Sequence, residues 1–163
     1  MPMVTFDKLL EEVARACHVV YGGRLVSLVV FGSVGRGTPR WDSDIDLLVV
    51  ADPLPHGRLR RAEEFSEVEE SMRDAFLAAR QSGLETRLSP VFKTPDEVRR
   101  GSPLFLDMLD DAIVLFDRDG FFGSEMVFFR ERLERLGARR VWIGDAWYWD
   151  LKPDYKPGEV FEL

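Results

Sequence analysis

The chain has only one cysteine, Cys17, among its 163 residues, and it lacks any long apolar run. A single cysteine excludes an internal disulfide, which makes a reducing, intracellular setting natural. No stretch approaches the roughly 18 apolar residues that a membrane span needs, and the N-terminus lacks the apolar core of a signal peptide. We therefore expect a cytoplasmic protein.

Positive charge is also scarce. Lysine and arginine number 22 against 29 aspartates and glutamates, which gives a net charge of −7. Proteins that bind nucleic acid neutralise its phosphates with clustered Lys and Arg, so this balance disfavours direct binding or polymerisation of DNA or RNA. The length and the 45% share of hydrophobic residues predict one globular domain.

One glycine-rich stretch carries most of the chemical information, and an apolar, β-branched segment, residues 24–31, leads into it. The composition of this segment predicts a buried strand. Gly32-Ser33 breaks the strand pattern. Gly35 and Gly37 keep the following backbone free of Cβ atoms, so that it can approach another group closely. We predict a turn and a short helix here, followed by a second strand.

The second strand begins with two carboxylates, Asp44 and Asp46. Residues i and i+2 of a strand point to the same face, so these side chains project together while Ile45 points to the other side. Adjacent carboxylates repel each other and resist burial, and a divalent cation removes that conflict. Ligation by oxygen alone favours Mg²⁺ or Mn²⁺ over zinc.

The turn before the aspartates suits an anion. Ser33 offers a hydroxyl, the backbone N–H groups from Gly32 onward lie where a helix begins, and Arg36 can add a charge-assisted contact. A lone Asp-x-Asp usually lies on a solvated face, and a lone Gly-Ser is usually only a turn. Their joint occurrence between two apolar strands predicts a site for phosphates and a metal.

The pattern Gly32-Ser33, ten residues, then Asp44-Ile45-Asp46 resembles the signature of the DNA polymerase β-like nucleotidyltransferase superfamily. In its fuller form, with Arg36-Gly37 and with Ser43 before the acid pair, it is similar to the minimal nucleotidyltransferases (MNT). The resemblance implies an α/β (α+β) fold, in which helices pack on a small mixed, mainly antiparallel sheet. We assign residues 1–137 to this nucleotidyltransferase domain.

The resemblance also implies the roles of individual residues. The turn would hold the triphosphate of ATP or another NTP, and the acid pair would hold two Mg²⁺ ions, with Mn²⁺ as an alternative. The nucleotide-binding residues would be Gly32, Ser33, Arg36, Gly37 and Ser43. The catalytic and metal-binding residues would be Asp44, Asp46 and a third carboxylate on a later strand.

The third carboxylate is the weakest part of this pattern. Residues 84–92 are predicted as the third strand, and Glu85 is the only acid in it. Glu85 lies at the beginning of the strand, whereas the family's acid usually lies within it. Asp107 and Asp111, near a fourth apolar strand at residues 112–116, are the alternatives. Without a third acid the pair would act alone, and the activity would be weak or lost.

Residues 58–82 are predicted as one long helix and residues 121–137 as another. The remaining segment, residues 138–163, is unusual because four tryptophans and tyrosines lie within residues 142–149. Trp and Tyr dominate interface hot spots. We expect this aromatic tail either to fold back on the domain or to dock on a partner.

The function implied by the resemblance is metal-dependent transfer of a nucleoside monophosphate, AMP from ATP, to a hydroxyl acceptor. Minimal nucleotidyltransferases of this appearance are similar to the antitoxin halves of HEPN/MNT pairs, which transfer AMP to a tyrosine of the HEPN toxin. One alternative is an antibiotic-modifying nucleotidyltransferase, although little chain remains to build its usual helical substrate domain. Another is a non-catalytic binding module that neutralises a partner by contact.

Overall fold

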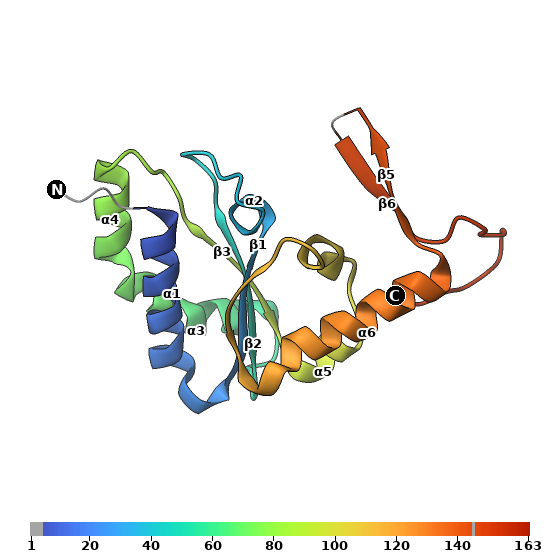
Figure 1. The fold of residues 1–163 in the computed structure, drawn as a ribbon. Helices are drawn as coiled ribbons and strands as arrows, with labels where there is room; N and C mark the ends of the chain where they lie inside the picture. The colour runs from blue at the N-terminus through green and yellow to red at the C-terminus, as the bar shows by residue number, and fades with distance from the viewer. Residues whose placement is uncertain (1–4, 145) are drawn as a thin grey trace.

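The computed structural model describes residues 5–144 and 146–163, and it is built on a four-stranded sheet with the strand order β3-β2-β1-β4 (Figure 1). Strand β1 is antiparallel to both β2 and β4, and β2 is parallel to β3. The mixed, mainly antiparallel sheet with helices packed on it is therefore confirmed. The strands are β1 Leu25–Phe31, β2 Ile45–Ala51, β3 Leu88–Lys93 and β4 Ile113–Asp117.

Helices cover both faces of the sheet (Figure 1). The first face is covered by α1 Phe6–Tyr21, α3 Arg58–Ser71 and α4 Arg73–Gln81. The second is covered by α5 Pro95–Arg99, the 3₁₀ helix η2 Pro103–Met108 and α6 Phe121–Leu136. Short helical turns complete the body: η1 Gly22–Arg24, α2 Gly32–Gly35 and η3 Arg118–Gly120. In the part of the chain that the structure describes, no helix is both long enough and apolar enough to cross a membrane.

The two central strands are apolar at nearly every position because both of their faces are buried. Alternate residues of β2 enter different clusters: Leu47 and Val49 pack with α1, α3 and α4, whereas Leu48 and Val50 pack with α5, η2 and α6. Asp46 has the same parity as Leu48 and Val50. The Asp46 side chain therefore lies at the end of the row that faces the second set of helices, whereas Asp44 comes just before the strand.

Two predicted elements differ from the structure. The third strand begins at Leu88 rather than at residue 84, and Pro90 lies on the edge of the sheet as its missing N–H requires. The predicted helix over residues 58–82 is divided at Met72 into α3 and α4. The Ser71 hydroxyl donates to the Val68 carbonyl (2.8 Å) at this point, a side-chain contact of the kind that bends helices.

The aromatic tail forms a hairpin of β5 Arg139–Ile143 and β6 Ala146–Asp150, which extends away from the sheet and its helices (Figure 1). After the hairpin the chain returns, and Leu163 packs against the second cluster. Arg132 of α6 donates to the Leu163 carbonyl oxygen (2.9 Å). The tail thus combines a projecting hairpin with an end segment that lies on the body.

The one cysteine is buried in the first cluster, where burial raises the pKa of the Cys17 thiol to about 12. A thiol with so high a pKa stays neutral and is a poor nucleophile at physiological pH. Cys17 therefore acts as a small core residue.

A buried polar contact joins β1, β4 and α6. Ser27 is fully buried and donates to Asp117 Oδ1 (2.8 Å), and the same carboxylate accepts the backbone N–H groups of Phe122 (2.8 Å) and Gly123 (3.0 Å). Asp117 thereby satisfies two amides of the first turn of α6, which lack partners within the helix.

We expect Asp117→Ala to lower the free energy of unfolding by about 2–4 kcal/mol, because it leaves the Ser27 hydroxyl and two amides without partners. Ser27→Ala removes only one of the three donors and should cost about 1 kcal/mol. Urea denaturation followed by circular dichroism measures both values. Equal losses in the two variants would show that Asp117 does not support α6.

Candidate functional site

The glycine-rich turn and the aspartates meet at one end of the sheet, where β1 ends and β2 begins (Figure 1). Phe31, the last residue of β1, lies opposite Asp46 in the antiparallel pair. The chain turns into α2 directly after Phe31, so the backbone of the turn lies against the start of β2.

The closest approach in this region is between Gly32 and Asp46. A Cβ atom on Gly32 would lie 2.1 Å from Asp46 Oδ2, and the φ angle of Gly32 is +66°. Two constraints therefore favour glycine at this position: the left-handed backbone conformation and the neighbouring carboxylate. The Asp46 carboxylate lies directly over the Gly-Ser turn.

The other two glycines serve different purposes. A Cβ on Gly35 would lie 2.9 Å from the Val30 carbonyl oxygen and 3.0 Å from that of Asp111, so α2 packs tightly at this point. Gly37 has a φ angle of +70° but nothing within 4 Å of its Cβ position. The expected close approach therefore occurs at Gly35, whereas Gly37 serves only the conformation of the turn.

The loop between α2 and β2 is held by its own hydrogen bonds. The Thr38 N–H donates to the Ser33 carbonyl (3.0 Å), and the Ser43 hydroxyl oxygen accepts the Arg40 N–H (2.8 Å). The Arg36 side chain is exposed, and among the described residues it makes no hydrogen bond or ion pair. Ser43 thus shapes the loop, while Arg36 is available to an anion.

The two aspartates have different electrostatic surroundings. Asp44 is half-exposed, and its Oδ2 lies 3.1 Å from Nε of Arg87, whose carbonyl accepts the Ile45 N–H (2.8 Å). The Asp46 carboxylate has no hydrogen-bond or ion-pair partner in the part of the chain that the structure describes. One negative charge at the start of β2 is therefore partly compensated, and the other is not.

Arg87 is a residue that sequence reasoning misses. Its contact with Asp44 depends on the parallel pairing of β2 with β3, in which Ser89 lies beside Asp46. Nothing in the sequence around Asp44 or Arg87 indicates that these two strands will pair. The contact itself is weak because the Arg87 side chain is 81% exposed to solvent.

Among the described residues, the structure does not gather a third acid around the pair. Glu85 is exposed in the segment before β3, and its backbone N–H donates to the Trp41 carbonyl (2.8 Å). Asp107 is exposed on η2, whereas Asp111 lies beside the turn through its contact with Gly35. Within residues 5–144 and 146–163, no three His, Cys, Asp or Glu side chains are placed together for a metal. Glu85 as a metal ligand stays a prediction.

The donor set nevertheless fits a hard cation. Asp44 and Asp46 supply carboxylate oxygens at the start of β2, and among the described residues no cation balances the Asp46 charge. Mg²⁺ and Mn²⁺ prefer such oxygen ligands and complete their coordination with water and phosphate oxygens. The chemistry available to this arrangement is metal-assisted phosphoryl or nucleotidyl transfer.

Comparisons with known proteins identify the family of this chain. The model of a family described as "Nucleotidyltransferase domain" matches residues 9–99, which include the turn and both aspartates. "Putative protein adenylyltransferase MJ1305" of Methanocaldococcus jannaschii is 28% identical over 148 residues, which cover 89% of this chain and 93% of that protein. "Putative protein adenylyltransferase MJ0604" of the same organism is 39% identical over 46 residues, which cover 28% of this chain and 46% of that protein.

The fold is also similar to that of a solved structure described as "Crystal structure of the toxin-antitoxin with AMP-PNP". The TM-score is 0.51 at 15% sequence identity, and the similarity covers 78% of this chain and 92% of that chain.

We expect Gly32→Ala and Gly37→Ala to lower the free energy of unfolding by a similar amount, about 1 kcal/mol, because both residues have positive φ angles. Only the methyl group at position 32 displaces the Asp46 carboxylate. Gly32→Ala should therefore lose Mn²⁺ binding in calorimetry, whereas Gly37→Ala retains it. Equal Mn²⁺ affinities in the two variants would show that Asp46 does not bind the metal.

Proposed function

The chain belongs to the nucleotidyltransferase domain family, and from this we propose that it is a protein adenylyltransferase, which moves AMP from ATP to a hydroxyl group of a partner protein. The similarity to a protein described as a protein adenylyltransferase supports this choice over most of the chain. The similar fold of a toxin–antitoxin structure with AMP-PNP, an ATP analogue, supports ATP as the donor.

One observation carries the proposal: the Asp46 carboxylate, which has no partner among the described residues, lies directly over the Gly32 turn. An uncompensated charge at the end of a buried strand is unfavourable by itself. It becomes favourable when a divalent cation and a phosphate chain occupy the space beside it.

The reaction would use groups of this chain in separate roles. The acceptor hydroxyl oxygen attacks the α-phosphorus of ATP, and the bond from that phosphorus to the bridging oxygen of pyrophosphate breaks. Ser33 and the backbone of the turn bind phosphate oxygens, and Arg36 offsets their charge. Two Mg²⁺ ions, held by Asp44 and Asp46, would stabilise the leaving pyrophosphate and lower the pKa of the attacking hydroxyl.

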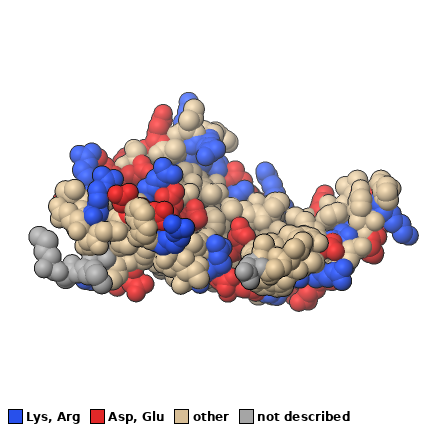
Figure 2. Space-filling view, turned by 90° about the horizontal axis from the view of Figure 1, so that it is seen from above, with Lys and Arg blue, Asp and Glu red and all other residues tan. Residues whose placement is uncertain are grey.

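For the acceptor we propose a tyrosine of a HEPN-type toxin, the partner implied by the MNT resemblance. The chain is acidic overall, and Figure 2 shows acidic and basic side chains interspersed over the face that it presents. Nucleic-acid binding needs clustered basic residues, so this surface favours a protein acceptor. The exposed Trp142, Ile143 and Tyr148 of the hairpin offer apolar contact area for such a protein.

A second candidate is a binding module that neutralises its partner by contact alone. The absence of a third acid around Asp44 and Asp46, within the described residues, favours this alternative. Transfer of AMP to a small molecule is the third candidate. Detection of metal-dependent transfer would decide between the enzyme and the binding module.

We expect Asp44→Asn and Asp46→Asn to abolish labelling of a partner protein by α-labelled ATP and Mg²⁺. The melting temperature of Asp46→Asn should stay the same or rise, because the repulsion between the carboxylates is relieved. A labelling assay on gels with a lysate of the source cell as acceptor, together with thermal melts, measures both effects.

Asp42→Asn is the matched control. It removes the same charge two residues before Asp44 and should keep the activity. Absence of label on any protein or small molecule with all four NTPs would contradict the enzyme assignment and support the binding module. A large loss of melting temperature in Asp46→Asn would show that Asp46 supports the fold instead.

A further inference from the structure

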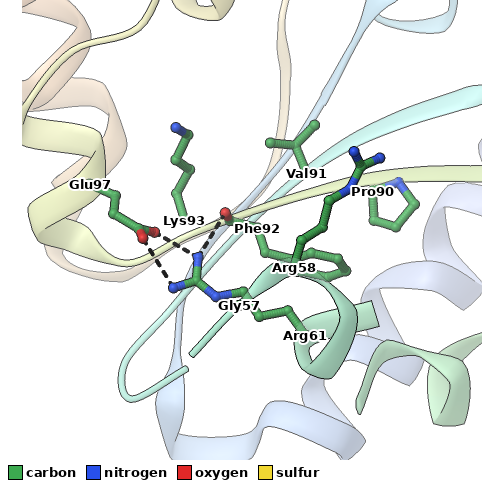
Figure 3. A pocket seen from close by; sticks show the side chains of 8 residues that line it. All are labelled: Gly57, Arg58, Arg61, Pro90, Val91, Phe92, Lys93 and Glu97. Carbon is green, nitrogen blue, oxygen red and sulfur yellow. Dashed lines mark hydrogen bonds and ion pairs between the residues drawn. The ribbon is translucent and has the colours of Figure 1, made fainter. Parts of the chain in front are cut away.

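A hollow of about 490 Å³ lies between the start of α3 and the outer edge of β3 (Figure 3). Its lining extends along β3 from Pro90, which pairs with Leu47 of β2, to Lys93, which pairs with Val50. Lys93 thus lies four strand residues, about 13 Å, from Ser89, which pairs with Asp46. The residues that line the hollow are Gly57, Arg58, Arg61, Pro90, Val91, Phe92, Lys93 and Glu97.

One ion pair forms the rigid part of this hollow. Arg61 holds both Glu97 oxygens with Nη1 and Nη2 (2.8 and 3.0 Å), and it also donates to the carbonyls of Pro55 (2.8 Å) and Phe92 (3.3 Å). Glu97 in turn accepts the Thr94 N–H (2.8 Å). The Arg61 contact lowers the pKa of the Glu97 carboxyl, so the pair stays ionised and its charges cancel.

Two further cations remain without a counter-ion. Arg58 and Lys93 make no hydrogen bond or ion pair among the described residues, and Figure 3 shows their charged ends on the same side of β3, with Val91 between them. Among the described residues, Glu97 is the only acid that lines the hollow, and its oxygens are already occupied by Arg61 and Thr94. The hollow thus carries two uncompensated positive charges in a chain whose net charge is −7.

The start of α3 adds to the positive potential. Gly57 precedes the helix without a side-chain cap, and no acid lies in the first turn, which instead contains Arg58, Arg60 and Arg61. Cations at a helix N-terminus are unfavourable because the helix dipole is positive there. The chain has 29 acidic residues, yet none of them lies in the first turn of α3. This repulsion between the cations and the helix dipole is unfavourable in the free protein, and an anionic ligand would relieve it.

The opposite wall of the hollow is apolar and fixed. Pro90 and Val91 belong to the edge strand, and the Phe92 ring packs edge-on against Phe65 of α3 (5.4 Å between centroids). Pro90 lacks an N–H, and the Phe92 carbonyl is occupied by Arg61, which blocks this edge to an added strand. A compact ligand with an apolar part therefore suits the hollow better than an extended peptide.

We propose that this hollow binds a phosphorylated small molecule, with its phosphate between Arg58, Lys93 and the first amides of α3 and its organic part against Pro90 and Val91. The volume lies within the range of small-ligand pockets, about 300–1,000 Å³. The site is separate from Asp44 and Asp46 and needs no metal. It would let the concentration of a phosphorylated metabolite act on α3 and on β3, the strand that pairs with β2.

Amide chemical shifts of the ¹⁵N-labelled full chain test this site. Inorganic phosphate, AMP and adenosine are titrated in EDTA, so that no metal supports binding at the aspartates. We expect phosphate and AMP to shift the amides of residues 57–61 and 91–93, and adenosine to leave them unchanged. A tighter response to AMP than to phosphate would identify a contribution of the organic part, and equal responses would identify the phosphate as the recognised group.

The Arg58→Gln/Lys93→Gln variant should weaken AMP binding by about tenfold or more, because it removes two charge-assisted contacts. Lys8→Gln/Arg15→Gln removes the same charge from α1 and should bind as the wild type does. An intact spectrum of each variant shows that it is folded. Shifts confined to residues 32–37, a response to adenosine equal to that to AMP, or unchanged binding in the Arg58/Lys93 variant would each overturn the proposal.

Discussion

The antiparallel register of β1 and β2 is the constraint on which the site depends. It sets Phe31 opposite Asp46, so the turn that follows β1 must pass directly beneath a carboxylate. Only glycine fits there, because any Cβ would meet Asp46 Oδ2. A shift of register by one residue would turn Asp46 to the other face of the sheet and would separate the two parts of the site.

The same sheet separates two regions of opposite charge. Strands β2 and β3 are parallel, so their N-terminal ends meet at the aspartates, whereas the cationic hollow lies along β3 from Pro90 to Lys93 at its C-terminal end. Between them lie the fully buried apolar residues of β2, which hold both ends in a fixed relation. One end of the sheet is thus suited to a cation with its phosphates, and the other to an anion alone.

The local parts of the fold and site could be predicted from the sequence. Gly32-Ser33, Asp44 and Asp46 lie within one short stretch, where strand alternation and glycine chemistry determine which groups come together. The contact of Arg87 with Asp44 and the gathering of Arg58 with Lys93 depend on which strands pair and where helices start, and no local pattern encodes that. The sequence predicts a third strand from residue 84 because residues 84–87 alternate as a strand does. In the structure Glu85 and Arg87 make isolated backbone hydrogen bonds to Trp41 and Ile45, and the ladder with β2 begins at Leu88.

The binding of AMP-PNP to the wild-type protein and to Asp46→Asn, measured by calorimetry in Mn²⁺ and again in EDTA, tests the central claim most directly. The claim is that Asp44, Asp46 and the Gly32 turn form one site in which metal and nucleotide bind together. It predicts that the wild-type protein binds AMP-PNP much more tightly in Mn²⁺ than in EDTA, and that Asp46→Asn loses this difference. Equal affinities in Mn²⁺ and EDTA, or a variant that keeps the full metal effect, would contradict it.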